Sequence, residues 1–415
     1  MSVARVPNLG LLSASPGYRL PTPASAGPGA EDARLGAVPK ARSFYHPELD
    51  SLRFLAFLPV FFHHTLPRND AFYTALGLPG PLAALASGFV SACGFGVDLF
   101  FLLSAYLITS LLLRERAAKG EVNIPWFYVR RALRLWPLYL SFILFALMLP
   151  LLSTEQKLGW RYGAGFMLFL GNWMIVTGGF PQSVVFPLWS VSVEQQFYFA
   201  WPWAVRSGTR RRIAWVAVAM LAVATLTRVY LVLHHAKHES IWCNTFARLD
   251  PIALGALLAI VLMDGIPRLG ARARAMLASV GLLLLLTAGR FSHVLDDPTP
   301  LMGNLWGYPA STLGCGLLLL AALRPANTTA GIGRSRSLVY LGKISYGLYV
   351  FHAFALWISI HAMEKLPSPW NCRLTFMVLG FVLTATLSAA SYQWLEQPFL
   401  RLKSRFAFVT SRPGA

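Results

Sequence analysis

Charged residues are scarce in this chain of 415 residues, in which Asp, Glu, Lys and Arg together make up only 13%. Hydrophobic residues make up 56%, a balance that excludes an ordinary water-soluble protein of several domains. Apolar runs long enough to cross a bilayer recur along the chain, for example at residues 213–233 and 376–395. The sequence therefore predicts an all-α polytopic membrane protein.

Acidic residues are scarcer than basic ones: 17 Asp and Glu stand against 36 Lys and Arg, which gives a formal net charge of +19. Such an excess of cations could indicate a nucleic-acid partner. The cations, however, lie at the ends of apolar runs and not along an aromatic-studded surface, which is typical of topology signals in membrane proteins. We therefore expect the lipid bilayer, and no nucleic acid, as a partner.

Cysteine occurs only four times, at positions 93, 243, 315 and 372. These positions have no metal-like spacing, so no metal site is predicted. Cys93, Cys243 and Cys372 fall on the predicted outer side of the membrane, where a disulfide between two of them is one alternative and free thiols are the other. None of the four is expected to act as a nucleophile.

Residues 1–44 lack the apolar core of a signal peptide and are rich in Pro, Ala, Gly and Ser. This composition predicts a disordered cytoplasmic tail. The membrane domain is predicted at residues 45–403. Residues 404–415 are expected to form a second cytoplasmic tail, so both termini lie in the cytoplasm.

Eleven apolar segments are candidate membrane spans. They are residues 52–67, 92–113, 135–153, 163–179, 186–205, 213–233, 247–264, 275–291, 304–323, 343–363 and 374–395. Arg and Lys cluster in five loops that are therefore expected to be cytoplasmic, at 114–134, 206–212, 268–274, 324–336 and 401–405. This charge pattern favours one of the segments 163–179 and 186–205 being re-entrant or interfacial. We expect a bundle of about ten transmembrane helices plus that one segment.

The first candidate span begins with a cation and ends with two imidazoles. Arg53 and His64 are eleven residues apart, about 16 Å along a helix, and eleven steps of 100° return to nearly the same face. Pro59 between them can kink the helix, and Asp50 can pair with Arg53. One interpretation is a boundary arginine and a packed histidine. The other is a functional cavity with a base, because ionisable groups within spans usually face one.

Five further blocks make the chain recognisable. Together with the Arg53–His64 pair, the chain resembles the acyltransferase 3 family from Tyr45 to about Lys403. The blocks are "GFGVDLFFLLSAYLITSLLLRERAAKGEVNIPWFYVRRALRLWPLYL" (94–140), "LWSVSVEQQFYFAWP" (188–202), "ARLDPIALGALLA" (247–259), "LGKISYGLYVFHAF" (341–354) and "SYQWLEQPFLRL" (391–402). The departures from the family pattern are mild. Ala105 stands where the family usually has another small residue, and Gln195 stands where it has a second carboxylate after Glu194. The motif at residues 396–398 reads Glu-Gln-Pro, with Gln397 at its variable middle position.

The resemblance implies an integral enzyme of a bacterial-type inner membrane. Such an enzyme moves an acetyl or other short acyl group from acyl-CoA to a carbohydrate hydroxyl, on a surface polysaccharide, a lipopolysaccharide or a glycosylated metabolite. It implies no permanently bound cofactor, because acyl-CoA is a substrate. In the family pattern the Arg-x10-His pair is essential, which here is Arg53 and His64, with His63 as the adjacent candidate.

The resemblance also implies a functional basic cluster, which here is Arg130, Arg131 and Arg134. Guanidinium groups suit the phosphates of coenzyme A, and residues 131 and 134 share a helix face, so the three side chains are expected to converge on one anion. Arg114 and Arg116 are interpreted as ordinary flanking cations. His64 would act as a general base, or alternatively form a transient acyl-histidine.

Several polar residues in later spans have two interpretations each. Glu194 either orients an imidazole or pairs with an arginine. Asp98 and Asp250 are expected to form structural ion pairs. Glu396 is likewise expected to form a structural ion pair. Tyr346, Tyr349 and His352 repeat at three-residue steps, and they either line the path of the acceptor or pack in the core.

Two rival functions compete with the enzyme. The first is a proton-coupled transporter or exporter, since intramembrane His, Asp and Glu suit proton coupling. Against it, no pair of matching interrupted halves is visible in the sequence. The second is a non-catalytic partner in polysaccharide assembly, which would have no need of a buried base. The enzyme is the function that the residues favour.

Overall fold

The structure is a computed structural model, and it describes residues 44–325, 332–364 and 372–406. These residues belong to one compact unit, residues 42–415. The described part of the chain contains helices and no strand, which confirms the prediction of an all-α membrane protein. The predicted tail at 1–44 lies outside the described residues except for Phe44, and so does most of the predicted tail at 404–415.

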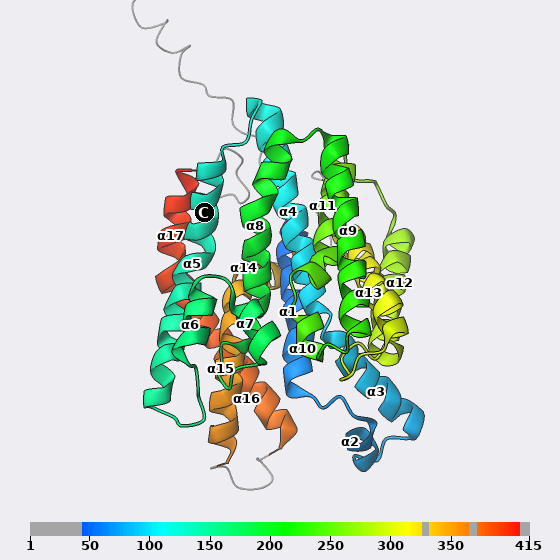
Figure 1. Cartoon of the computed structure of the whole chain (residues 1–415), viewed down its shortest axis with the longest axis vertical. Helices are drawn as coiled ribbons and strands as arrows, with labels where there is room; N and C mark the ends of the chain where they lie inside the picture. Colours follow the sequence, from blue (N-terminus) through cyan, green and yellow to red (C-terminus); the bar gives the residue numbers. More distant parts are fainter. Residues whose placement is uncertain (1–43, 326–331, 365–371, 407–415) are drawn as a thin grey trace, which may run out of the picture. The chain divides into compact units, whose positions relative to one another are not determined.

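The long α-helices follow the apolar runs of the sequence (Figure 1). Their bounds are α1 Pro47–Thr65, α2 Asp70–Ala75, α3 Gly80–Cys93, α4 Gly96–Lys119, α5 Ile124–Met148, α6 Trp160–Met167, α7 Gly171–Gly178, α8 Trp189–Ser207, α9 Arg210–Leu233, α10 His238–Trp242, α11 Leu249–Val261, α12 Ala271–Phe291, α13 Leu301–Ala322, α14 Arg336–Lys343, α15 Ser345–Met363, α16 Arg373–Ser391 and α17 Gln397–Ser404.

Eight helical segments of the described chain are long and apolar enough to cross a membrane. Helices α1 and α8 are 19 residues each and run through the same bundle, but they contain charged and polar residues of the candidate site (Figure 1). Such residues lower the apolarity of a helix without preventing it from lying in a bundle, where they face a cavity or a partner. The apolar helices thus show a membrane protein, whereas the number of ten spans stays a prediction.

The predicted segment at 163–179 is broken into two short helices. Helices α6 and α7 have eight residues each, about 12 Å, which is far less than the hydrocarbon thickness of a bilayer. Phe169 between them has a φ of 57°, in the left-handed region, so one helix cannot continue through it. The segment 186–205, by contrast, contains one long helix, α8. Of the two alternatives, the segment that does not cross as a single helix is therefore 163–179.

The predicted span at 92–113 is displaced in the structure. Helix α4 begins at Gly96 and continues to Lys119, and it is preceded by α3, which the sequence analysis did not predict. Gly96 lets α4 approach α1 closely, because a Cβ at this position would lie 2.7 Å from the Ala56 carbonyl oxygen. This contact fixes α1 against α4 next to the candidate site.

The basic loops meet at one end of the bundle. The Arg116 guanidinium at the end of α4 donates to the Val205 carbonyl oxygen near the end of α8 (2.5 Å), and Arg210 at the start of α9 pairs with Asp264 after α11 (2.8 Å). Arg274 at the start of α12 donates to carbonyl oxygens at the end of α13. In Figure 1 the α4–α5 and α8–α9 turns lie at the top. This arrangement agrees with the charge pattern, while the cytoplasmic side stays a prediction.

Two ion pairs are fully buried inside the bundle. Arg248 pairs with Asp98, and Arg228 pairs with Asp250 at 3.1 Å. The side chains of both arginines are at most 1% exposed, and the Ser311 hydroxyl also donates to Asp98 (2.9 Å). Two positive and two negative charges thus neutralise one another while they join α4, α9, α11 and α13. The expectation of structural pairing is confirmed for Asp98 and Asp250.

All four cysteines are free thiols. Cys93, Cys243 and Cys315 are buried, and Cys372 is exposed. Of the two alternatives for Cys93, Cys243 and Cys372, the structure therefore has the free thiols and not the disulfide.

We predict that Asp98→Asn strongly destabilises the protein, because it leaves the buried Arg248 guanidinium without its anion, a loss of about 3–5 kcal/mol. The matched control is Asp264→Asn, which breaks the exposed pair with Arg210 and should change stability little. Thermal unfolding in mild detergent measures both. Equal shifts of the unfolding temperature for the two variants would contradict the structural role of the buried pair.

Candidate active site

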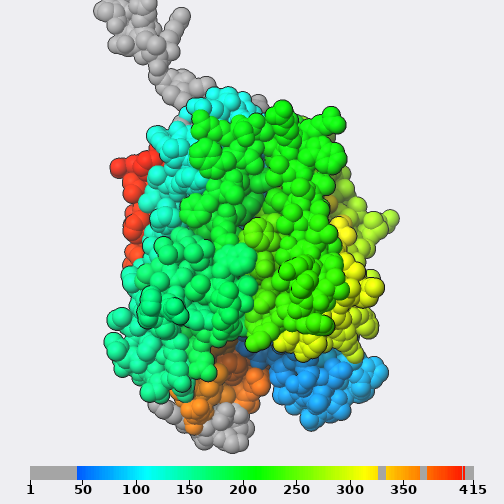
Figure 2. Space-filling model, viewed as in Figure 1, coloured from blue at the N-terminus to red at the C-terminus, as the bar shows by residue number. Residues whose placement is uncertain are grey.

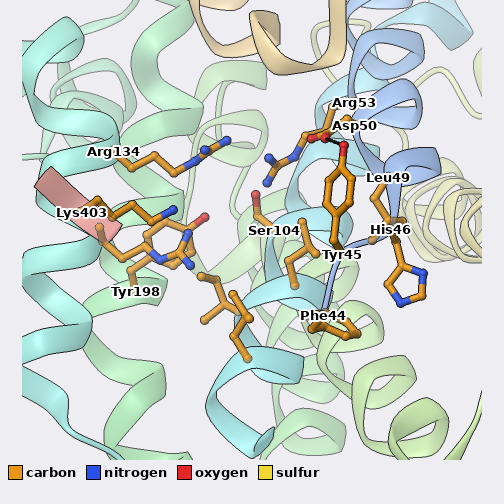
Figure 3. Close-up of a pocket in the computed structure, with 14 residues that line it drawn as sticks. Phe44, Tyr45, His46, Leu49, Asp50, Arg53, Ser104, Arg134, Tyr198 and Lys403 are labelled. Carbon is orange, nitrogen blue, oxygen red and sulfur yellow. Dashed lines mark hydrogen bonds between the residues drawn. The ribbon is translucent and has the colours of Figure 1, made fainter. Parts of the chain in front are cut away.

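A cavity lined by basic side chains lies between α1, α4, α5 and α8, and we call it the basic cavity. It has two adjoining parts that share Arg53, Ser104, Arg131, Arg134 and Tyr198. The mouth part also contacts Lys403 of α17, and the deep part extends to Glu194, Tyr346 and Tyr349. Figure 3 shows the guanidinium groups of Arg53 and Arg134 pointing toward one another, with Lys403 on the same side as Arg134. Four cations thus surround one space.

Three of these cations come from two helices. Arg131 and Arg134 are three residues apart on α5 and face the same cavity, as the helical period predicts. Arg53 enters from α1 on the opposite wall. Arg131 also lies near the ring of Tyr198, 5.7 Å from its centroid, which restricts the guanidinium within the cavity. Free volumes of about 50 and 60 Å³ in the two parts make the cavity narrow.

Arg130 is the exception to the predicted triad. Its guanidinium pairs with Glu115 of α4 at 2.6 Å and donates to the Phe406 carbonyl oxygen at 3.0 Å. It does not line the basic cavity, because a helical step of 100° turns it away from Arg131 and toward α4. The expectation that Arg130, Arg131 and Arg134 converge on one anion is therefore corrected: the structure brings Arg131 and Arg134 together with Arg53 and not with Arg130.

Glu194 lies in the deep part of the basic cavity. It accepts a hydrogen bond from the Tyr198 hydroxyl one turn along α8, and it faces the same space as Arg53, Arg131 and Arg134. His64 does not line this cavity. Glu194 thus shares a cavity with the arginines and not with His64, and both interpretations of its role stay predictions.

His64 lines a second, larger cavity, which we call the histidine cavity. Its volume is about 590 Å³, and its walls include Glu155, Ser183 and Trp357. The loop after α5 and the second half of α15 form these walls, whereas the basic cavity is lined by the first turns of α5 and by α17. The two cavities therefore face opposite ends of the bundle. In Figure 2 the orange α15 and α16 lie beside the teal segment that includes α5 and α6 at the end of the histidine cavity.

One hydrogen bond fixes the tautomer that a neutral His64 has. Its Nδ1 lies 2.9 Å from the Val60 carbonyl oxygen. A carbonyl oxygen only accepts, so Nδ1 donates the hydrogen, and in the neutral imidazole the lone pair is then on Nε2. The adjacent candidate, His63, is bonded in the same way to the Val90 carbonyl oxygen of α3 (3.1 Å) and lines neither of the two cavities. Of the two neighbouring imidazoles, His64 is thus the one that lines the histidine cavity.

One layer of side chains separates the two cavities. The ring of His352 lies 5.0 Å from that of His64, and its Nδ1 donates to the Tyr349 carbonyl oxygen at 2.6 Å. The Tyr349 hydroxyl lies 2.6 Å from the Ser190 hydroxyl, and Tyr349 lines the deep part of the basic cavity. His352 is fully buried, and its Nε2 has no hydrogen-bond partner among the described residues. The rings of His64, His352 and Tyr349 therefore form a continuous series of contacts from one cavity to the other, with 5.5 Å between the ring centroids of His352 and Tyr349.

The rim of the histidine cavity contains a charged cluster. The Trp357 indole N–H donates to Glu155 Oε2 (3.0 Å), and His361 Nε2 lies 3.1 Å from the same oxygen. The hydrogen bonds from Trp357 and His361 lower the pKa of the Glu155 carboxyl, which keeps it ionised. Sequence reasoning missed Glu155 and Trp357, because a contact across 202 residues leaves no local pattern.

Comparisons with known proteins identify the family of the chain. A family model described as "Acyltransferase domain" matches residues 46–393, which is most of the chain. The chain belongs to the acyltransferase 3 family. The resemblance inferred from the motifs is thereby confirmed, and the matched range includes every residue named above in the two cavities except Lys403.

The chain is also similar to curated proteins of Staphylococcus aureus. The protein named "O-acetyltransferase OatA" of strain NCTC 8325 is 24% identical over 393 residues, which cover 89% of this chain and 60% of that protein. Proteins named "Putative O-acetyltransferase" of strains MSSA476 and MRSA252 are each 25% identical over 375 residues, 86% of this chain and 57% of theirs. The chain therefore spans less than two thirds of the length of these relatives. No solved structure matches it.

The opposite openings of the two cavities predict opposite accessibility in vesicles. In a Cys372→Ser background, which removes the exposed native thiol, Gln182→Cys at the histidine cavity and Lys403→Cys at the basic cavity should react with a membrane-impermeant maleimide from opposite sides. Reaction rates in sealed right-side-out and inverted vesicles measure this. Labelling of both thiols from the same side would refute the two-sided arrangement.

Proposed function

We propose that this member of the acyltransferase 3 family is a membrane O-acyltransferase. It moves an acetyl or other short acyl group from acyl-CoA to a hydroxyl of a carbohydrate at a bacterial-type inner membrane. The names of the similar proteins support O-acetyl transfer. The observation that favours it most is the back-to-back arrangement of a basic cavity and a cavity with a neutral imidazole, because the two substrates of such a reaction need these two environments.

The basic cavity suits the acyl-CoA donor. Arg53, Arg131, Arg134 and Lys403 provide several donors for the phosphates of the nucleotide, and guanidinium groups bind phosphate oxygens in pairs. The deep part is narrow, and Phe100, Phe101 and Leu135 line it beside the polar groups, so it suits the slender pantetheine arm. In this proposal the nucleotide sits at the mouth near Lys403, and the arm extends past Arg53 toward Tyr349.

The histidine cavity suits the acceptor. His64 Nε2 takes the proton of the acceptor hydroxyl while its oxygen attacks the thioester carbonyl carbon. The C–S bond then breaks, and the coenzyme A thiolate receives the proton, so that atoms and charge balance. The alternative is attack by Nε2 itself, which forms an acyl-histidine that the hydroxyl then cleaves. In either route the acyl group passes the layer of His352 and Tyr349, and donor and acceptor approach from opposite ends.

The transporter alternative receives no support from the family match or from the similar proteins. Two of the buried carboxylates that it would use for proton coupling, Asp98 and Asp250, are each paired with a buried arginine. We therefore do not propose it.

His64→Ala should abolish acyl transfer, with a loss of at least about 100-fold in kcat, because the general base is removed. Release of coenzyme A from acetyl-CoA by the purified protein measures the effect. His63→Gln is the matched control, since this neighbouring imidazole packs against α3 and lines neither cavity, and it should retain activity. Equal activity of wild type and His64→Ala would exclude His64 as the base, and no turnover of any short acyl-CoA by the wild type would refute the proposed function.

Arg131→Gln and Arg134→Gln should each raise the KM for acetyl-CoA by about tenfold, because each removes a charge-assisted phosphate contact. This increase in KM should become smaller at higher salt, because screening then weakens the arginine–phosphate contacts of the wild type as well. Arg211→Gln, at an exposed position at the start of α9, is the control and should leave the KM unchanged. A KM unaffected by either cavity variant would remove the basic cavity from donor binding.

A further inference from the structure

The histidine cavity is a built site and not an incidental gap between helices. Two loops form one wall, and hydrogen bonds hold them together: the Lys157 amide donates to the Gln182 carbonyl oxygen (2.6 Å), and the Val184 amide donates to Gln156 Oε1 (3.0 Å). Gln156 is itself buried, 6% exposed. The wall therefore has a fixed shape before any ligand arrives.

Two oxygen atoms in this cavity have capacity for a ligand. Ser183 is 6% exposed, and its Oγ has no hydrogen-bond partner among the described residues. Buried hydroxyl groups are nearly always hydrogen-bonded in folded proteins, so Ser183 points to a polar group that arrives with a ligand. The contacts of the Glu155 carboxylate with Trp357 and His361 both use Oε2, which leaves Oε1 able to accept from a ligand hydroxyl.

An aromatic surface lies beside these oxygens. Trp357 lines the cavity and is only partly buried, and its bond to Glu155 fixes the orientation of the indole ring. Phe186 and Phe376 line the same space. A fixed aromatic ring next to hydroxyl-binding oxygens has the two properties that bind a pyranose, whose faces present C–H groups and whose edge presents hydroxyls. A volume of about 590 Å³ corresponds to roughly 20 water volumes, enough for more than one ring.

We propose that Trp357, Glu155 and Ser183 form the acceptor subsite, and that it selects an uncharged pyranoside over a uronic acid. This inference rests on the proposed function and names the acceptor that the same site takes. The pyranose lies on Trp357, its hydroxyls bond Glu155 Oε1 and Ser183 Oγ, and one hydroxyl faces His64 Nε2. An anionic sugar is disfavoured because its carboxylate meets the ionised Glu155 carboxylate at short range.

The test uses two glycosides that differ only at C6. The full-length protein in proteoliposomes receives radiolabelled acetyl-CoA with p-nitrophenyl β-glucopyranoside or with p-nitrophenyl β-glucuronide. Label on the glycoside and release of free coenzyme A are measured separately. The wild type should acetylate the glucopyranoside with a kcat/KM about tenfold or more above that of the glucuronide.

The variants separate the subsite from the rest of the enzyme. Trp357→Ala should raise the KM for the glucopyranoside by about tenfold while the KM for acetyl-CoA is unchanged. Ser183→Ala should raise the same KM by a smaller factor, and Glu155→Gln should reduce the discrimination against the glucuronide. Trp394→Ala is the matched control, because this tryptophan is 75% exposed and does not line the cavity.

The measurements distinguish a failure of the acceptor subsite from a failure of the proposed function. Acetyl-CoA turnover that depends on His64, together with no acetylation of the glucopyranoside or no effect of Trp357→Ala on its KM, overturns the acceptor subsite and leaves the proposed function standing. Preference for the glucuronide overturns the charge selection. No turnover of acetyl-CoA by the wild type refutes the proposed function itself.

Discussion

The pairing of Arg248 with Asp98 and of Arg228 with Asp250 holds the bundle together around four charges that could not otherwise be buried. An isolated charge in an apolar interior costs several kcal/mol, whereas two opposite pairs with hydroxyl donors such as Ser311 satisfy one another. The same constraint applies to every cation of the bundle. Arg130 meets it through Glu115, whereas Arg53, Arg131, Arg134 and Lys403 line the basic cavity.

The position of α1 connects the two halves of the proposed reaction. Its first half contributes Arg53 to the basic cavity, and its second half contributes His64 to the histidine cavity, about 16 Å further along the helix. An acyl donor bound by its phosphates at one end needs a long arm to bring its thioester near the imidazole at the other. A coenzyme A thioester has such an arm, and the thin layer of His352 and Tyr349 lies where the arm would end.

Much of the helical framework could be predicted from the sequence, because apolar runs of about 20 residues in a bilayer have few alternatives to a helix. The shared face of Arg131 and Arg134 followed from the helical period, and the cost of a buried charge predicted that Asp98 and Asp250 would each be in an ion pair, without giving the partners. The partner of Arg130 did not, since Glu115 lies on another helix and the helical period gives a direction but not a neighbour. The helical period also predicted that Arg53 and His64 lie on one face of α1. It could not predict that different helices surround the two ends of that face. Helix α3 was missed because its run of small residues, from Gly80 to Cys93, has few of the large apolar side chains that mark a span.

The close contact of Gly96 with the Ala56 carbonyl oxygen has a mechanical consequence. Two helices whose backbones touch interlock, so α1 cannot slide or tilt against α4 without steric overlap. The guanidinium of Arg53 and the imidazole of His64 are then anchored on a stiff support and keep a constant separation during turnover. In the proposed reaction, the part that moves between the two ends of the bundle is accordingly the acyl group on the flexible arm of its donor, and the α1–α4 contact stays in place.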